Sequence, residues 1–217
     1  EGDVVAENLE KFQGLDHREI VLKLIEAKRS YAVTHNLKNF QGLDHKEIAS
    51  KFFELGWRRD VVVNLEKFQG LDHKEIALKL IEAKEGEFLI NKLEKFKGLD
   101  QEIVLKLIEE GRGYDVANNL EKFQELQGLD KEVALQLIEA GGGYAVANNL
   151  EKFQGLGHKE IALKLFEMEL GEVVENNLGK FHGLDQEIAS KLIETGWGSV
   201  VVINRQSFQG LELNQEI

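Results

Sequence analysis

Apolar side chains recur along the chain at the spacing of one helix face, in short segments separated by glycine. Starting at Ile20, apolar residues stand at i, i+1, i+4 and i+5, which is the pattern of an amphipathic helix. Starting at Val33, they stand at i, i+4 and i+7 and stop two residues before Gly42. The pattern predicts two short helices, called helix A and helix B below, joined by a brief connection.

The A–B pattern repeats along the whole chain. A Gly-Leu pair closes each copy, and successive pairs are 28, 28, 28, 30, 27, 28 and 27 residues apart. The boundaries between copies lie near Gly14, Gly42, Gly70, Gly98, Gly128, Gly155, Gly183 and Gly210. Three copies lack one residue of the segment that starts helix A, at Asp100, Asp130 and Asp185. A near-constant period of this length is typical of stacked repeats.

Both ends of each predicted helix are encoded locally. Asp16, Asp44 and Asp72 stand at the N-cap of helix A, each with a glutamate three residues later. The glycine and leucine that follow helix B are typical of a Schellman stop. Glutamate precedes lysine by four residues in several A helices, which adds about 0.2–0.5 kcal/mol per pair. These pairs are Glu19–Lys23, Glu47–Lys51, Glu75–Lys79 and Glu160–Lys164.

One helical hairpin of 28 residues cannot bury both of its apolar faces, so the copies must stack on one another. We therefore predict an all-α fold, a right-handed α-solenoid of about seven helix-turn-helix repeats of 27–30 residues. The repeats form a single array over residues 1–217. Because the chain begins and stops partway through a repeat, we expect it to be a piece of a longer array.

Composition limits the compartments and the binding partners expected for this fold. The chain has no cysteine, which excludes disulfides and thiolate metal sites and fits a reducing, cytoplasmic compartment. No apolar run approaches the ~18 residues of a membrane span, and no signal peptide is visible. The net charge of −12 argues against coating of nucleic acid or of an anionic membrane through the overall field.

Residues that could carry catalysis are scattered. Four histidines occupy the same place in the first turn of helix A, where we expect them to be solvated: His17, His45, His73 and His158. Because stacked helices lie about 8–10 Å apart, these imidazoles cannot share a metal ion. The serines lie outside any Gly-x-Ser-x-Gly context, and the glycine clusters at 111–113 and 141–143 lack a phosphate loop's strand and lysine. We therefore predict no enzyme activity, no cofactor and no metal.

The connection between helix A and helix B is the part that changes most between copies. It collects both tryptophans, all three tyrosines and four of the six arginines. These candidate binding residues are Arg29, Tyr31, Trp57, Arg58, Arg59, Arg112, Tyr114, Tyr144 and Trp197. Such residue types dominate binding hot spots, so an edge that binds a partner is one interpretation. The other is that the aromatic side chains fasten each helix B to its neighbour.

Asparagine recurs in helix B although it is a mediocre residue inside a helix. The positions are Asn8, Asn36, Asn64, Asn119, Asn149, Asn177 and Asn204. The amides could form a structural ladder by bonding backbone groups of the adjacent copy. Alternatively they could hold an extended peptide by its backbone, as armadillo-repeat proteins do.

Two families resemble this pattern. Stacked helix pairs are similar to the armadillo, HEAT and tetratricopeptide class, although 28 residues is a short period for it. The residues Leu129-Asp130, Val133-Ala134, Glu139-Ala140 and Gly141-Gly142 follow the outline of transcription-activator-like effector repeats. That resemblance implies DNA reading by a variable residue pair, which is here a near-constant Glu-Ala.

We predict a non-enzymatic helical-repeat scaffold that binds a protein or peptide through the connection edge or the concave face. The first alternative is a nucleic-acid-binding array of the transcription-activator-like effector type. The second is a structural spacer, or an array that associates end to end through its terminal repeats.

Overall fold

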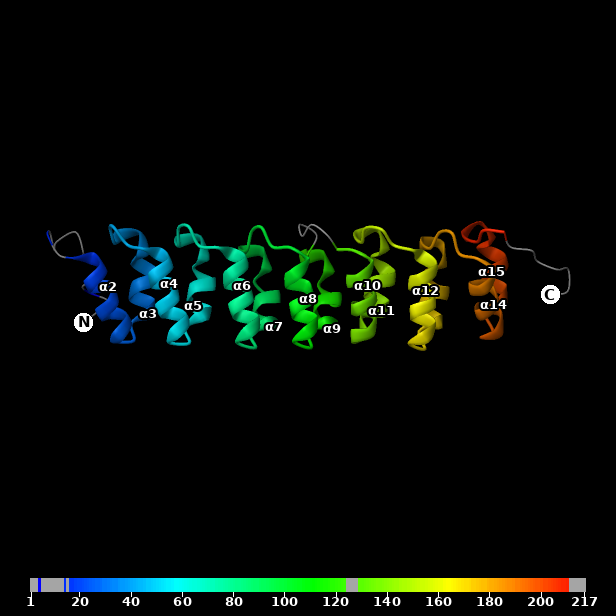
Figure 1. Cartoon of the computed structure of the whole chain (residues 1–217), viewed down its shortest axis with the longest axis horizontal. Helices are drawn as coiled ribbons and strands as arrows, with labels where there is room; N and C mark the ends of the chain where they lie inside the picture. The colour runs from blue at the N-terminus through cyan, green and yellow to red at the C-terminus, as the bar shows by residue number, and fades with distance from the viewer. Residues whose placement is uncertain (1–3, 5–13, 15, 124–128, 211–217) are drawn as a thin grey trace. The chain divides into compact units, whose positions relative to one another are not determined.

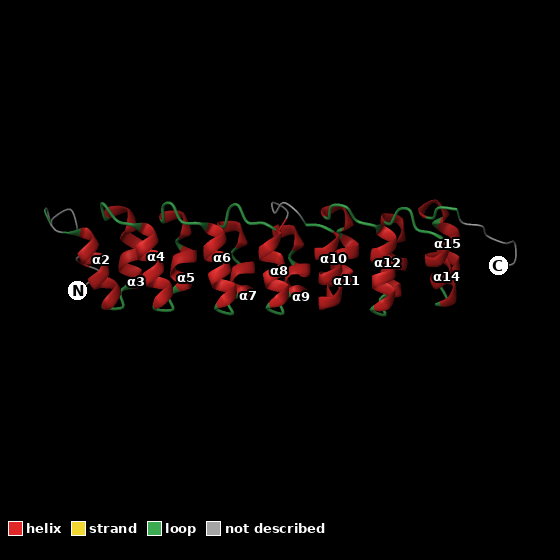
Figure 2. Cartoon of the chain, viewed as in Figure 1, coloured by secondary structure: helices red, strands yellow, loops and turns green. Residues whose placement is uncertain are grey.

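The protein is described from a computed structural model, shown in Figure 1. Its described residues are 4, 14, 16–123 and 129–210. Over these residues the secondary structure is helical, with no β-strand and only isolated bridges between single residues (Figure 2). The predicted all-α class is confirmed.

Each copy contains a longer helix A and a shorter helix B, and within each unit the two pack together, as α4 and α5 do in Figure 1. The A helices are α2 (His17–Glu26), α4 (His45–Glu54), α6 (His73–Glu82), α8 (Gln101–Glu109), α10 (Lys131–Leu137), α12 (His158–Glu167) and α14 (Gln186–Glu194). The B helices are α3 (Ser30–Asn36), α5 (Arg58–Val63), α7 (Gly86–Ile90), α9 (Gly113–Asn118), α11 (Gly143–Asn148), α13 (Gly171–Asn176) and α15 (Gly198–Ile203).

A short helical turn follows each B helix. These turns are η2 (Leu37–Asn39), η3 (Leu65–Lys67), η4 (Leu93–Lys95), η5 (Leu120–Phe123), η7 (Leu150–Lys152), η8 (Leu178–Lys180) and η9 (Arg205–Ser207). In the fifth copy, helix α10 continues as the wider turn η6 (Ile138–Gly142).

The helices group into two compact units. Unit 1 contains residues 1–80 and 92–97, and unit 2 contains residues 81–91 and 98–217. Within unit 1, α2 packs on α3 and α4, and α5 packs on α3 and α4. Within unit 2, α10 packs on α8 and α12, and α11 packs on α9 and α13. In these parts of each unit, an A helix therefore contacts its own B helix and the A helix of a neighbouring copy.

The start of helix A is fixed by the predicted aspartate cap. The Oδ1 atom of Asp16 accepts from the backbone N–H groups of Arg18 and Glu19, at 2.9 and 3.2 Å. Asp44, Asp72 and Asp185 each accept two backbone N–H groups in the same way. Helix α12 begins instead at Gly157, which offers no side-chain acceptor.

The connection from helix A to helix B has a fixed backbone despite its variable sequence. The residue two positions after the last glutamate of helix A, or of η6 in the fifth copy, has a left-handed backbone conformation in each described copy. At Gly56, for example, φ is 78°. Three copies place a residue with a Cβ in this conformation: Lys28, Lys84 and Glu169, with φ of 57°, 61° and 60°. Residues other than glycine adopt it at a cost of roughly 1–2 kcal/mol. The variation that the sequence displays is therefore variation of side chain on one conserved turn.

Both apolar faces of each pair are buried. Phe52 and Leu65 in unit 1, and Phe123 and Phe181 in unit 2, are at most 1% exposed. Burying such side chains contributes roughly 1.5–3 kcal/mol each. Because the faces point toward neighbouring copies as well as toward the partner helix, stacking within each unit supplies much of the burial.

The predicted Glu–Lys pairs are present in two of the four cases. Glu19 pairs with Lys23, and Glu75 pairs with Lys79, each at 2.6 Å. Glu47 pairs instead with Arg18, and Glu160 pairs with Lys131 at 2.9 Å. The prediction was wrong at Glu47 and Glu160 because a cation in the first turn of the preceding helix A reaches the same carboxylate. Glu47 and Glu160 thus link neighbouring A helices.

Candidate functional site

Each first-turn histidine links the start of helix A to the turn after helix B of the same copy, so the expectation that these side chains are solvated was wrong. The Nδ1 atom of each imidazole accepts a backbone N–H from the turn that follows the next helix B. The donors to His17, His45, His73 and His158 are the N–H groups of Gln41, Gln69, Lys97 and His182, at 2.8, 2.7, 2.9 and 2.8 Å. Each ring also contacts a phenylalanine edge-on, with centroids 5.9–6.1 Å apart.

Two copies without this histidine form the equivalent link with backbone alone. In the fifth copy, the carbonyl of Leu129 accepts from the N–H of Gln154 at 2.7 Å. In the seventh copy, the carbonyl of Leu184 accepts from the N–H of Gln209 at 2.6 Å. The one-residue deletion and the loss of histidine therefore occur together, since the shorter segment brings a carbonyl to the place of the imidazole. That correlation was visible in the sequence.

The environment of two of these imidazoles favours the neutral form by lowering the pKa. Burial lowers the pKa of His73, and the nearby Lys97 lowers it further, while Asp72 acts in the opposite direction. Burial also lowers the pKa of His158, with a further contribution from His182. A neutral imidazole can accept a hydrogen bond, so the shift agrees with the geometry. Among the described residues, no group of three histidines or acids could hold a metal ion.

The candidate residues of the connection edge fall into two groups. In the first group the side chains contact neighbouring residues: the ring of Trp57 packs edge-on against Phe52, at 5.7 Å between centroids. The guanidinium of Arg112 lies 3.3 Å from Asp115 and 3.6 Å from Glu87 of the preceding copy. The hydroxyl of Tyr144 donates to Glu172 of the following copy at 2.6 Å.

The second group lies in solvent. Arg29, Tyr31, Arg59 and Tyr114 are exposed, and the ring of Tyr31 stacks on His35 at 5.1 Å. Arg58 and Trp197 are half-buried. Some candidate residues of the connection therefore contact neighbouring residues of the fold, as the structural interpretation expects. The exposed ones are the part of the edge that a partner can contact.

Glycine in the connection serves close packing between copies. A Cβ at Gly113 would stand 2.3 Å from the Cβ of Ala140, and one at Gly143 would stand 2.5 Å from Leu170. Any larger residue would force the neighbouring copies apart. This packing gives the glycine clusters a structural reason that needs no ligand.

The predicted asparagine ladder is turned inward. The side-chain amide of each described member donates to the carbonyl four residues earlier in its own helix, at 2.8–3.1 Å. These members are Asn36, Asn64, Asn119, Asn149, Asn177 and Asn204, and Asn8 lies outside the described residues. A bond to the adjacent copy, which the structural interpretation expected, is made instead by lysine. The Nζ atom of Lys95 donates to the carbonyl of Val63 at 2.8 Å.

A different row of asparagines faces solvent in unit 2. Its members are Asn91, Asn118, Asn148 and Asn176, one beside or within each of α7, α9, α11 and α13. All four are exposed, and these B helices contact one another in sequence. We call this set the asparagine row. The exposed Tyr114 and Tyr144 lie one helical turn before Asn118 and Asn148. The sequence shows adjacent Asn-Asn pairs, but only the fold decides which member points outward.

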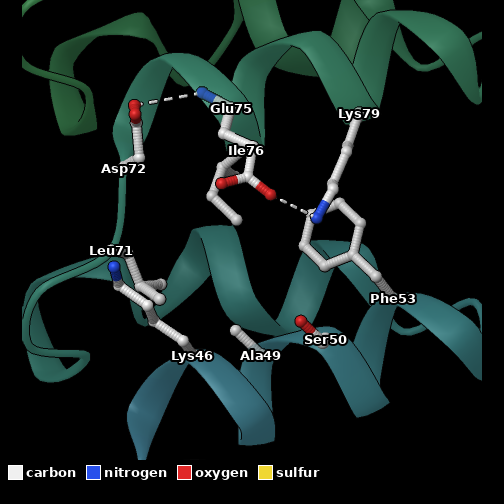
Figure 3. Close-up of a pocket in the computed structure, with 9 residues that line it drawn as sticks. All are labelled: Lys46, Ala49, Ser50, Phe53, Leu71, Asp72, Glu75, Ile76 and Lys79. Carbon is white, nitrogen blue, oxygen red and sulfur yellow. Dashed lines mark hydrogen bonds and ion pairs between the residues drawn. The ribbon is translucent and has the colours of Figure 1, made fainter.

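A cleft of about 250 Å³ lies between helices α4 and α6 of unit 1 (Figure 3). Its lining residues are Lys46, Ala49, Ser50, Phe53, Leu71, Asp72, Glu75, Ile76 and Lys79. The Lys79 ammonium lies 5.8 Å from the centroid of the Phe53 ring while it pairs with Glu75. Sequence reasoning missed this cleft because it depends on two A helices that are neighbours only in the fold.

Comparison with protein-family models, with curated proteins and with solved structures finds no significant match. None of the helices within the described ranges is long and apolar enough to cross a membrane.

Proposed function

We propose that the chain is a non-enzymatic scaffold, an α-solenoid of about seven helix pairs, that binds an extended segment of another protein along the B helices of unit 2. The observation that supports this best is the asparagine row. Four exposed amides stand at equivalent positions on neighbouring helices. Unlike the inward set, none of them bonds the carbonyl four residues earlier among the described contacts, and Asn148 has one long side-chain contact, in which its Oδ1 accepts from Lys180 at 3.4 Å.

The row matches the chemistry of an extended backbone. A side-chain amide offers both donors and an acceptor, as a peptide group does. Packed helices lie about 8–10 Å apart, and three residues of extended chain span about 10 Å at ~3.3 Å per residue. One amide could therefore meet every third peptide unit of the bound segment. Tyr114 and Tyr144 add aromatic surface next to the row, which is a common source of interface affinity.

The proposal is tested with a displayed library of random peptides about twelve residues long, enough to span four pairs at three residues each. Peptides selected on the chain are measured against a variant carrying Asn118→Ala and Asn148→Ala. Loss of two hydrogen-bonding amides should cost about 1–3 kcal/mol, which is roughly a 5- to 150-fold loss of affinity.

A matched control is Asn39→Ala, because Asn39 is an exposed asparagine in η2 of unit 1 and lies away from the row. This variant should bind the selected peptides as the unchanged chain does. Peptides that bind the double variant with undiminished affinity would exclude the asparagine row as the binding surface.

A further inference from the structure

The cleft between α4 and α6 exists because one leucine of the repeat is missing there. Ser50 lies at a position of helix A where most other copies have leucine. Those residues are Leu22, Leu78, Leu105, Leu135 and Leu163, and all five are half-buried. With a serine instead, the side chains of Ala49, Phe53 and Ile76 line an open hollow in Figure 3.

Lys46 is one of the residues that line the cleft, and the carboxylate expected to pair with it is already paired with another lysine. Three of the equivalents of Lys46 in other copies pair with a carboxylate at the start of the following helix A, namely Arg18, Lys131 and Lys159. For Lys46 that carboxylate would be Glu75, but Glu75 pairs with Lys79 at 2.6 Å. Among the described residues, no carboxylate is left within ion-pair distance of the Lys46 ammonium.

We propose that this cleft binds a partner segment that inserts a leucine side chain and places a carboxylate against Lys46. The leucine would occupy the space that the protein's own leucines fill in the equivalent positions, in contact with Ala49, Phe53 and Ile76. The carboxylate would give Lys46 the ion pair that Arg18 and Lys131 already have. This site belongs to helix A in unit 1 and does not depend on the asparagine row of unit 2.

Three small probes separate the two parts of the site. N-acetyl-leucine carries the side chain and the carboxylate, N-acetyl-leucine amide lacks the charge, and N-acetyl-alanine lacks the side chain. Each is titrated into the ¹⁵N-labelled chain while the amide signals of Ala49, Ser50 and Ile76 are followed. N-acetyl-leucine should saturate with a Kd on the order of 1–10 mM, the range expected of so small a ligand. The amide should bind about two- to fivefold more weakly, as the loss of an exposed ion pair predicts.

Substitutions give the decisive comparison. Ser50→Leu restores the repeat's own residue and should abolish the titration, whereas Ser190→Leu, the same change at the equivalent position of α14, should leave it unchanged. Lys46→Gln should remove the difference between N-acetyl-leucine and its amide, without depending on how Ser50→Leu folds. Shifts that persist in Ser50→Leu, equal shifts with N-acetyl-alanine, or no saturable shift up to about 50 mM would each overturn the proposal. Peptides selected on the asparagine row should bind the Ser50→Leu variant normally, so failure of one site is distinguishable from failure of the other.

Discussion

Acidification from about pH 7.5 to about pH 5.5 should loosen the junctions that depend on histidine. A protonated imidazole has no acceptor, so His73 and His158 cannot keep both a second proton and the backbone hydrogen bonds at 2.9 and 2.8 Å. The folded-state pKa of each is lowered, chiefly by burial. The unfolded chain therefore binds more protons than the folded chain in this window. The stabilisation is complete above the unfolded pKa of about 6.5 and is lost as the pH falls through the folded pKa.

The magnitude follows from the hydrogen bonds. Each bond contributes about 0.5–1.5 kcal/mol, so losing those at His73 and His158 should lower the free energy of unfolding by about 1–3 kcal/mol. For a chain of 217 residues this corresponds to a fall in melting temperature of about 2–12 °C. The carboxylates of Glu47, Glu66 and Asp185 have lowered pKa values, so their ion pairs persist to more acidic pH than this window.

The assay is guanidinium unfolding followed by helical circular dichroism at both pH values. A variant with His73→Ala and His158→Ala should be less stable at about pH 7.5 and should show a flatter pH dependence. His35→Ala is the matched control, because His35 is exposed on α3 and its described ring contact is the stack on Tyr31, not a hydrogen bond from a backbone N–H. If the double variant keeps the full pH dependence, the histidine junctions are not its source and the reasoning fails.

Three further predictions concern stability and use the same unfolding assay. Gly157→Asp should add the missing N-cap of α12 and stabilise the chain by about 0.3–1 kcal/mol, and no gain would contradict the capping argument. Lys84→Gly should remove the strain of its positive φ and add about 1 kcal/mol, whereas Lys79→Gly inside α6 should cost about that much. Trp57→Ala should cost about 1.5–3 kcal/mol through the lost contact with Phe52, while the exposed Arg29→Ala should change stability by less than about 0.5 kcal/mol. Equal effects at Trp57 and Arg29 would show that the edge has no structural members.

The features that sequence predicted correctly are those determined within a few residues. Asp16 caps the helix that follows it because its acceptor and both donors lie within three residues. Periodicity alone was enough to predict paired helices and the buried faces of Phe52 and Leu65.

The features that sequence missed depend on contacts between segments that are distant in sequence. His17 lies in a first turn, where exposure is the usual outcome, and only the packing of α3 on α2 brings the N–H of Gln41, 24 residues later, to it. Glu47 has cations on two sides, and sequence spacing could not decide between Lys51 and Arg18. Asn118 and Asn119 are adjacent and chemically identical, so only the direction of helix α9 shows which one faces solvent.

The histidine junction also bears on how such a chain can lengthen. Its donor is a main-chain N–H, supplied by glutamine at Gln41 and Gln69, by lysine at Lys97 and by histidine at His182. Both partners of the bond lie in the same copy, so each copy carries this bond with it whatever its neighbours are. Duplication or loss of whole copies would preserve every junction of this kind, so the chain has the properties of a modular part whose length can change before its surfaces diverge.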